Sequence, residues 1–418
     1  MKVLKDLDEL VENQIITKEI ADGILSYYQS KKVSPQKRLF IVFGILGAIL
    51  VGLGINLIIA HNWDDFSRPV KAFFAFLPLV IGQLACVFVI IKKYKSTAWR
   101  EGASAFLFFA VGASISLISQ IYNIPGDLSS FLLTWALLTL PLIYVMNSSF
   151  TSLLFIAGIT WYACETEYWT YPQREAWFYW GLLFAALPHY YLLYKNKPKS
   201  NFIAFHNWMV SLSVIICLGS LAGEYSELMF IAYMSLFGLL FLVGNFKHFK
   251  YQKLINNAFL IAGSLGTIIL LLILSFDWFW DELSFSKLSS LNTLVSPEFI
   301  ATVLISVLAI VLLIKELRTS DIRKINSLNW TFLVFILVFL IGLATEFAYV
   351  LINLLILTIG LLHVRKGAQK IIGNFKLWFI GNYHTHCLQV STKYKFCYSW
   401  GVICWCRYRI FCDKLFND

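Results

Sequence analysis

The side chains of this chain best suited to binding a ligand lie in two short polar motifs, Asn62-Trp63-Asp64 and Gln120–Asp127. Carboxylates, amides, an imidazole and a phenol together supply charge and directional hydrogen bonds. Brought side by side, they would form an outward-facing pocket for a polar headgroup or a cation. The candidate binding residues are His61, Asn62, Asp64, Gln120, Tyr122 and Asp127.

The same motifs also fit ordinary turn and helix-cap chemistry. Pro125-Gly126 is typical of a turn, and Asp127 can cap a helix that begins at Leu128. Asp64 can likewise cap a short helix that leads into the next apolar run. Both interpretations stay open from the sequence alone.

The elements that must position these motifs are membrane-spanning helices. Apolar residues make up 59% of the 418 residues and charged residues only 14%, with a mean hydropathy of +0.70. A soluble domain carries about 25% charged residues, so a soluble fold is excluded. The N-terminus lacks the apolar core of a signal peptide.

The apolar runs predict an all-α, polytopic transmembrane helical bundle, because backbone polar groups in lipid must be satisfied within helices. We expect about 12 spans of roughly 20 residues each in a transmembrane domain over 38–380. The fifth run is short and is tilted, re-entrant or extended by Asn147-Ser148. The predicted spans are 39–60, 70–91, 102–121, 128–146, 150–164, 176–194, 203–222, 227–245, 257–276, 298–314, 329–345 and 347–362.

The connections alternate in charge, and this predicts the orientation. Lysine and arginine fill every second connection, so the positive-inside rule places the N-terminus in the cytoplasm. The net charge of +10 therefore orients the protein in the bilayer, and we expect no nucleic-acid partner. The basic segments are 31–38, 92–100, 195–199, 247–253, 315–324 and 365–376. The opposite connections contain Asp64, Asp65, Asp127, Glu165, Glu167, Glu224, Glu227, Asp277, Asp281 and Glu282.

Residues 1–37 are predicted to form a small cytoplasmic helical hairpin. Leu7 and Leu10 lie on one face of a first helix, which Asn13-Gln14 interrupts with left-handed backbone. Thr17 can cap a second helix. The hairpin either binds a cytoplasmic protein partner or packs on the membrane surface or on loops.

Approximately residues 1–165 resemble the bacterial membrane-protein family called domain of unknown function 2157. The resemblance rests on the hairpin ending in Tyr27-Tyr28, the glycine-rich span from Gly44 to Gly54, and the two polar motifs with Arg68-Pro69-Val70-Lys71 between them. It implies an integral protein of the bacterial cytoplasmic (inner) membrane, in contact with membrane lipids. It implies no established activity.

Polar residues inside the predicted spans are few, and none forms a catalytic set. His189, His206, Asn207 and Asn353 are expected to be interhelical hydrogen-bond partners before they are ligands. No carboxylate lies at mid-membrane, which weakens proton-coupled transport. The sequence contains none of the phosphate-binding, dinucleotide or zinc-hydrolase motifs, so we expect no catalytic residue, cofactor or resident metal.

The segment 381–418 differs in character from the rest of the chain. Five of the eight cysteines lie in it, together with His384 and His386, and this composition resembles that of a metal or disulfide site. The cysteines and histidines, however, do not have the regular spacing of metal ligands. Reading the codons one nucleotide later turns cysteine into valine or alanine and produces two further apolar spans. We interpret the segment as frame-shifted, giving about 14 spans when corrected. A genuine basic, cysteine-rich tail is the alternative, and resequencing around codon 380 distinguishes the two.

Three classes of function remain. A transporter or lipid translocation protein fits the span number and the polar outer motifs. A membrane sensor or assembly factor, signalling through the hairpin, is the alternative. An enzyme would need a convergent acid, base or nucleophile, which the sequence lacks. A polar cavity reaching mid-membrane would favour transport, whereas a filled core with an exposed hairpin would favour the sensor.

Overall fold

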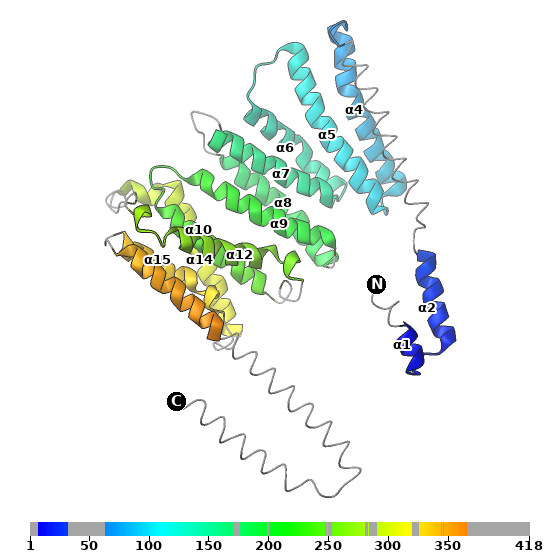
Figure 1. Ribbon diagram of the computed structural model, residues 1–418. Helices are drawn as coiled ribbons and strands as arrows, with labels where there is room; N and C mark the ends of the chain where they lie inside the picture. The colour runs from blue at the N-terminus through cyan, green and yellow to red at the C-terminus, as the bar shows by residue number, and fades with distance from the viewer. Residues whose placement is uncertain are drawn as a thin grey trace, which may run out of the picture. The chain divides into compact units, whose positions relative to one another are not determined.

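The computed structural model describes residues 7–31, 63–169, 176–198, 200–246, 249, 253–280, 283, 291–319, 326–343, 345 and 347–365. Every regular element in these ranges is a helix, which confirms the all-α fold (Figure 1). The predicted first span, 39–60, with its glycines, lies outside the described residues, as do His61, Asn62 and the proposed frame-shifted tail.

The chain divides into two compact units. The first comprises residues 1–81 and 113–125, and the second comprises residues 82–112 and 126–418. The boundaries cross α4 (Arg68–Phe88) and α5 (Thr97–Tyr122), so each of these helices contributes to both units. The domain boundaries predicted from the sequence, at 37/38 and 380/381, stay a prediction.

The first unit contains the N-terminal hairpin. Helices α1 (Leu7–Glu12) and α2 (Lys18–Lys31) pack through Leu7 and Ala21, which are 3% and 9% exposed. The left-handed residue between them is Gln14, with φ of 54°. The predicted hairpin is therefore present, although glutamine and not asparagine adopts the unusual backbone.

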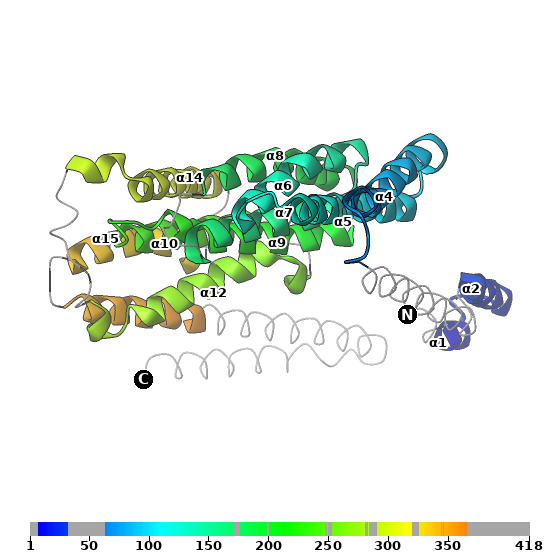
Figure 2. The same cartoon turned by 90° about the horizontal axis from the view of Figure 1, so that it is seen from above.

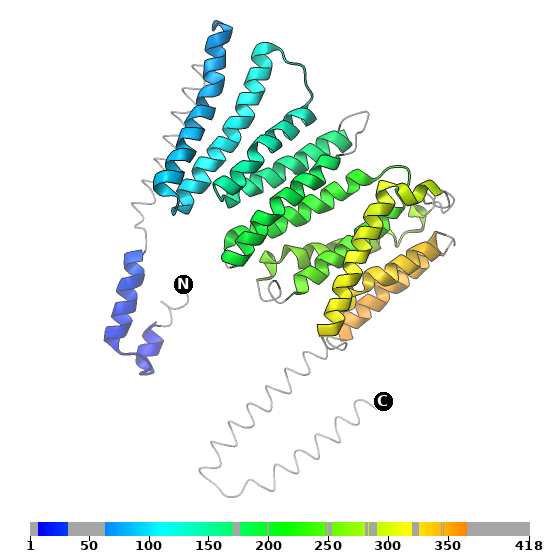
Figure 3. The same cartoon turned by 180° about the vertical axis from the view of Figure 1, so that it is seen from behind.

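The second unit contains a row of helices that follow the predicted spans closely. Helices α6 to α9 lie side by side, and Figure 3 shows the same arrangement from behind. Helices α12, α14 and α15 all contact α10 (Figure 2). The helices are α6 (Leu128–Val145), α7 (Ser149–Cys164), α8 (Trp177–Asn196), α9 (Asn201–Leu218), α10 (Leu228–Asn245), α12 (Ala258–Ile273), α14 (Pro297–Thr319), α15 (Thr331–Gly342) and the helix Ala348–Arg365.

Asn147 and Ser148 separate α6 from α7. Asn147 has a φ of 45°, and the Ser148 side chain accepts a hydrogen bond from the Thr151 amide as the N-cap of α7. Left-handed backbone ends a helix, and an N-cap begins one. Of the three alternatives for the short fifth run, an extension through Asn147-Ser148 is therefore excluded, and a π-helical turn, Glu165–Trp169, extends the helix at its other end.

Helix α10 is the centre of the larger apolar core. Of its most apolar 18-residue window, 72% is buried, so neighbouring helices cover most of its surface. This burial accounts for the apolar residues found around most of the helix. Gly244 and Gly263 let α10 and α12 approach closely: a Cβ on Gly263 would lie 2.5 Å from the Phe241 amide nitrogen. A second apolar core joins α6, α7, α8 and α9.

The helices are suited to a bilayer. Among the described residues, seven are long and apolar enough to cross a membrane, and α12 and α15 are shorter apolar helices. Large apolar side chains are exposed along them, such as Phe184 at 70% and Leu304 at 59%, as lipid-facing positions require. The chain is thus a multi-pass membrane protein, while the number of spans stays a prediction.

Candidate functional site

Glu101, near the start of α5, holds the N-terminus of α7. Its carboxylate accepts hydrogen bonds from the amides of Ser149 and Phe150, at 3.1 and 2.8 Å, and from the Ser148 hydroxyl at 2.5 Å. A helix N-terminus presents amides without intrahelical partners and a partial positive charge, both of which favour a carboxylate. Glu101 therefore acts as a helix cap supplied by another helix.

His206 lies in the same polar network, at the start of α9. Its Nδ1 lies 2.7 Å from the Phe202 carbonyl, which can only accept, so Nδ1 carries the proton. Its Nε2 then accepts from the Ser152 hydroxyl at 3.1 Å, and its ring stacks on Tyr190 at 5.6 Å between centroids. The imidazole is fully engaged between helices.

His189, Asn207 and Asn353 are engaged in the same way. His189 Nε2 lies 3.4 Å from the Ser149 hydroxyl, and the Asn207 amide donates to the Asn256 carbonyl at 3.1 Å. Asn353 donates to the Ser275 carbonyl at 2.9 Å. The prediction that isolated histidines and asparagines join helices is confirmed for His189, His206 and Asn207, whereas Asn353 joins its helix to the turn after α12.

At the opposite ends of the helices of this unit, Glu167, Glu227 and Glu298 are buried carboxylates. Glu298, in the first turn of α14, is 2% exposed and accepts from the amides of Gly223 and Tyr225, at 2.8 and 3.1 Å. Gly223 permits this approach, since a Cβ there would lie 3.0 Å from Glu298 Oε1. Glu227, directly before α10, is 1% exposed. Thr302 fixes the neighbouring backbone by donating to the Leu228 carbonyl at 3.1 Å.

Tyr168, in the π-helical turn after α7, lies at this same end. Its hydroxyl donates to the Ile216 carbonyl at 2.7 Å. The turn is thereby fixed to the end of α9.

A cavity of about 350 Å³ opens beside Glu227. The wall combines one buried carboxylate with two aromatic rings and apolar side chains, and Tyr233 donates its hydroxyl to the Ile215 carbonyl at 2.9 Å. A carboxylate and aromatic rings around an apolar cavity are typical of sites for organic cations. The lining residues are Ser226, Glu227, Met229, Phe230, Tyr233, Leu270 and Leu283.

The candidate residues from the sequence lie elsewhere. Asp64 is exposed in a turn before α4, where Ser67 directly precedes the helix and its carbonyl accepts from the Lys71 amide. Gln120 and Tyr122 are exposed near the end of α5, and Gln120 makes a 3.5 Å contact with the Ser116 hydroxyl.

Asp127 is the N-cap of α6. Its carboxylate accepts from the Ser130 amide at 2.7 Å and from the Ser129 hydroxyl at 3.3 Å, which confirms the predicted cap. Asp64, Gln120 and Tyr122 belong to the first compact unit, and Asp127 belongs to the second. A pocket formed by all six residues stays a prediction.

Sequence reasoning missed the structural roles of Glu101, Glu227 and Glu298. It placed Glu227 among the loop charges and gave Glu101 and Glu298 no role. Their positions in the sequence could have indicated these roles, because each glutamate lies within the first residues of an apolar helix or directly before one. All three lie at helix ends, so the expectation of no carboxylate at mid-membrane is not contradicted. Among the described residues, no group of three or more His, Cys, Asp or Glu side chains could hold a metal ion.

Comparison with known proteins identifies a family model that matches the N-terminal part of the chain. Residues 8–152 match a family model described as "Predicted membrane protein (DUF2157)", in agreement with the resemblance seen in the sequence. No curated protein and no solved structure matches the chain.

Proposed function

We propose that this multi-pass membrane protein binds a small organic cation in the cavity beside Glu227 and moves it across the bilayer. The observation that carries the proposal is the cavity itself, in which a carboxylate 1% exposed lies among Phe230, Tyr233 and apolar side chains. In a wall of low dielectric constant, a carboxylate attracts a cation far more strongly than it would in water.

The surroundings of the cavity favour a cation over an anion. Glu298 adds a second buried carboxylate, bound to the loop that precedes Glu227. The rings of Phe230 and Tyr233 present electron-rich faces to a positive charge. An anion at this position would meet the Glu227 carboxylate and no basic side chain among the residues that line the cavity.

A polar interface between α7 and α9 supports movement across the bilayer. Ser213 of α9 contacts the hydroxyl of Thr160 in α7 at 2.6 Å and that of Tyr179, near the start of α8, at 2.7 Å, while Ser152 and His206 lie near the other end of α7 and α9. The described helices pack closely around these groups, and a filled core by itself is what a sensor would have. Translocation would require these helices to rearrange, as alternating access does.

Replacing Glu227 with glutamine should abolish most of the binding. We expect the dissociation constant of tetraethylammonium, measured by equilibrium dialysis with the full chain in detergent, to rise about 10- to 100-fold, because a charge-assisted contact contributes about 1.5–3 kcal/mol. Uptake of the same cation into proteoliposomes should fall in parallel.

Glu224→Gln is the matched control, since Glu224 is exposed three residues earlier in the same loop. It should bind and transport as the unchanged protein does. Thermal unfolding of both variants separates lost binding from lost folding. Equal binding by Glu227→Gln, or no binding by the unchanged protein at millimolar cation, would overturn the proposal.

A sensor is the second candidate, and the N-terminal hairpin favours it. Ile15, Ile20 and Leu25 are 67%, 53% and 40% exposed on α2 and the turn before it, as a partner-binding surface would be. Cation binding at Glu227 without any uptake in proteoliposomes would favour this function over translocation.

We further propose that the protein resides in a bacterial cytoplasmic membrane with its N-terminus in the cytoplasm, on the basis of the alternating basic connections. In a cysteine-free background, an impermeant thiol reagent added to intact cells should label Phe66→Cys and leave Ser96→Cys unlabelled. Labelling of Ser96→Cys alone would reverse the orientation.

A further inference from the structure

Helices α7 and α9 run parallel in the same direction, with their polar residues paired in one register. Near the start of the two helices, the Ser152 hydroxyl donates to His206 Nε2 at 3.1 Å, and farther along, the Thr160 and Ser213 hydroxyls lie 2.6 Å apart. These contacts join residues 54 and 53 positions apart, so the register holds along the shared length of the helices. Short hydroxyl side chains meet only where two helix backbones lie close together, so α7 and α9 are closely packed at Thr160.

Cys164 and Cys217 continue this register. Each lies about one helical turn beyond the contacting hydroxyl of its own helix, and the two cysteines are again 53 positions apart. The Tyr179 hydroxyl, which lies 2.7 Å from the Ser213 hydroxyl, also bonds to the Cys217 thiol, and Cys164 lies within electrostatic range of Tyr179 and Cys217. A disulfide needs Cα atoms about 4.4–6.8 Å apart, a spacing that closely packed helices provide.

The two thiols differ in accessibility. Cys164 is partly exposed, whereas Cys217 is 0% exposed. In thiol–disulfide exchange, an accessible thiolate first attacks an external disulfide and forms a mixed disulfide, which a second thiolate then resolves. Cys164 suits the first role, and Cys217, protected from external reagents, suits the second.

The cysteine pair lies at the acidic end of the helices. Glu165 and Glu167 follow Cys164 in the turn after α7. In the proposed orientation, on which this inference rests, the acidic end faces the periplasm, an oxidising compartment in which disulfides persist.

We propose that Cys164 and Cys217 form a reversible disulfide that crosslinks the outer ends of α7 and α9. The Cys164 thiolate attacks the disulfide of a periplasmic dithiol–disulfide protein, and one sulfur of that disulfide leaves as a thiolate. Cys217 then loses its proton and attacks the Cys164 sulfur, which releases the second sulfur of the external protein. The two thiols of this chain thereby lose two electrons and two protons, and the external disulfide gains both and becomes a dithiol. A reduced dithiol protein reverses the same steps.

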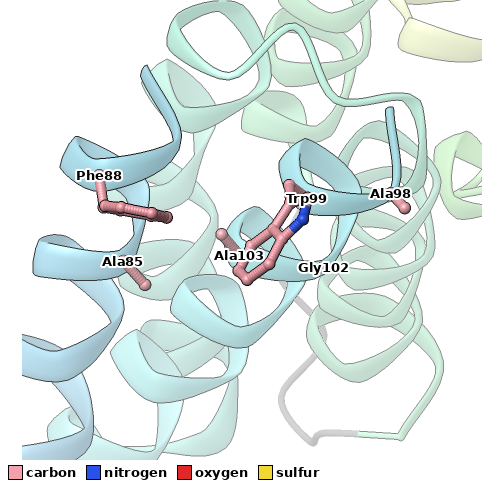
Figure 4. A pocket seen from close by; sticks show the side chains of 6 residues that line it. All are labelled: Ala85, Phe88, Ala98, Trp99, Gly102 and Ala103. Atoms are coloured by element: carbon pink, nitrogen blue, oxygen red, sulfur yellow. The ribbon is translucent and has the colours of Figure 1, made fainter. Parts of the chain in front are cut away.

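Cys86 provides an internal reference for this reaction. It lies in α4, next to Ala85 of the small apolar groove between α4 and α5 (Figure 4). It belongs to the same apolar cluster as Met146, which lies shortly before the start of α7. Cys164 is the last residue of α7, about 24 Å away along a helix of 16 residues, so Cys86 should stay a free thiol.

The test maps disulfides in the purified full chain in detergent, with the five cysteines of 381–418 replaced by serine so that they do not compete. The reduced protein is treated with oxidised glutathione, and the remaining thiols are blocked with N-ethylmaleimide in denaturant. Peptides are then identified by mass spectrometry without reduction. We expect the main linkage to join the Cys164 and Cys217 peptides, to disappear on reduction, and to leave Cys86 labelled by maleimide.

The variants separate the chemistry from the register. Cys164→Ser and Cys217→Ser should each abolish the linkage, and Cys86→Ser should keep it. Thr160→Cys with Ser213→Cys, in a chain that carries both serine replacements, should crosslink as well, because it uses the same register one turn earlier. Glutathione retained on Cys164 without transfer to Cys217, an equally frequent linkage to Cys86, or a crosslink in the Thr160–Ser213 pair alone would each overturn the proposal.

The same linkage should be present in cells. Acid quenching of intact cells, followed by maleimide blocking and peptide mapping, should find Cys164 joined to Cys217 in the membrane-bound protein. A crosslink that the purified chain forms but that is absent from cells would overturn the proposal. Labelling of Phe66→Cys shows separately whether the orientation fails with it, and binding of tetraethylammonium at Glu227 is measured independently of both.

Discussion

Replacing Gly263 with alanine will destabilise the protein, although the same change in an open helix stabilises it. The new Cβ would lie 2.5 Å from the Phe241 amide nitrogen and 2.6 Å from the Phe237 carbonyl oxygen. Both are backbone atoms of α10, which cannot rotate away, so the two helices must separate. We expect a loss of about 1–3 kcal/mol, measured by thermal or denaturant unfolding in detergent.

Gly181→Ala, in α8, should change the free energy of unfolding in the opposite direction. No atom lies within 4 Å of its added Cβ, so the change should be neutral or stabilising by about 0.5–1 kcal/mol, through the higher helix propensity of alanine. A shift of the same sign and size in both variants would show that close packing between α10 and α12 does not stabilise the fold.

Replacing Glu101 with alanine will cost more than removing an ordinary helix cap. Three donors at the start of α7 lose their acceptor, and two of them are backbone amides. Each unsatisfied donor in a buried setting costs about 1–3 kcal/mol, and partial access of water reduces the sum. We expect a loss of about 2–3 kcal/mol in the free energy of unfolding.

Asp127→Ala is the reference for this effect. Asp127 caps its own helix from an exposed position, so its loss should cost about 1 kcal/mol. The free energy of unfolding of Glu101→Gln should lie between those of the unchanged protein and Glu101→Ala, because the amide oxygen still accepts one hydrogen bond. An Asp127→Ala loss equal to or above that of Glu101→Ala would contradict the role assigned to Glu101.

The sequence alone determined which segments are helical and where many of them begin. The predicted run 128–146 is α6, Leu128–Val145, and Asp127 caps it as predicted. Both results rest on local physics: lipid enforces helices on long apolar runs, and a cap bonds to an amide three residues away. The interhelical role of His206 also followed, since a polar group in lipid seeks a partner.

The tertiary structure alone decided which polar residues and glycines matter. Glu298 bonds to amides 75 and 73 residues away, and Glu101 to amides 48 and 49 residues away. A glutamate at a helix end has the same neighbours in sequence whether water or another helix surrounds it. Gly263 and Gly181 likewise look alike in sequence, since both lie within apolar helices. Only at Gly263 would an added Cβ lie against the backbone of a neighbouring helix. Burial and close approach depend on how distant helices pack, and local sequence does not encode that.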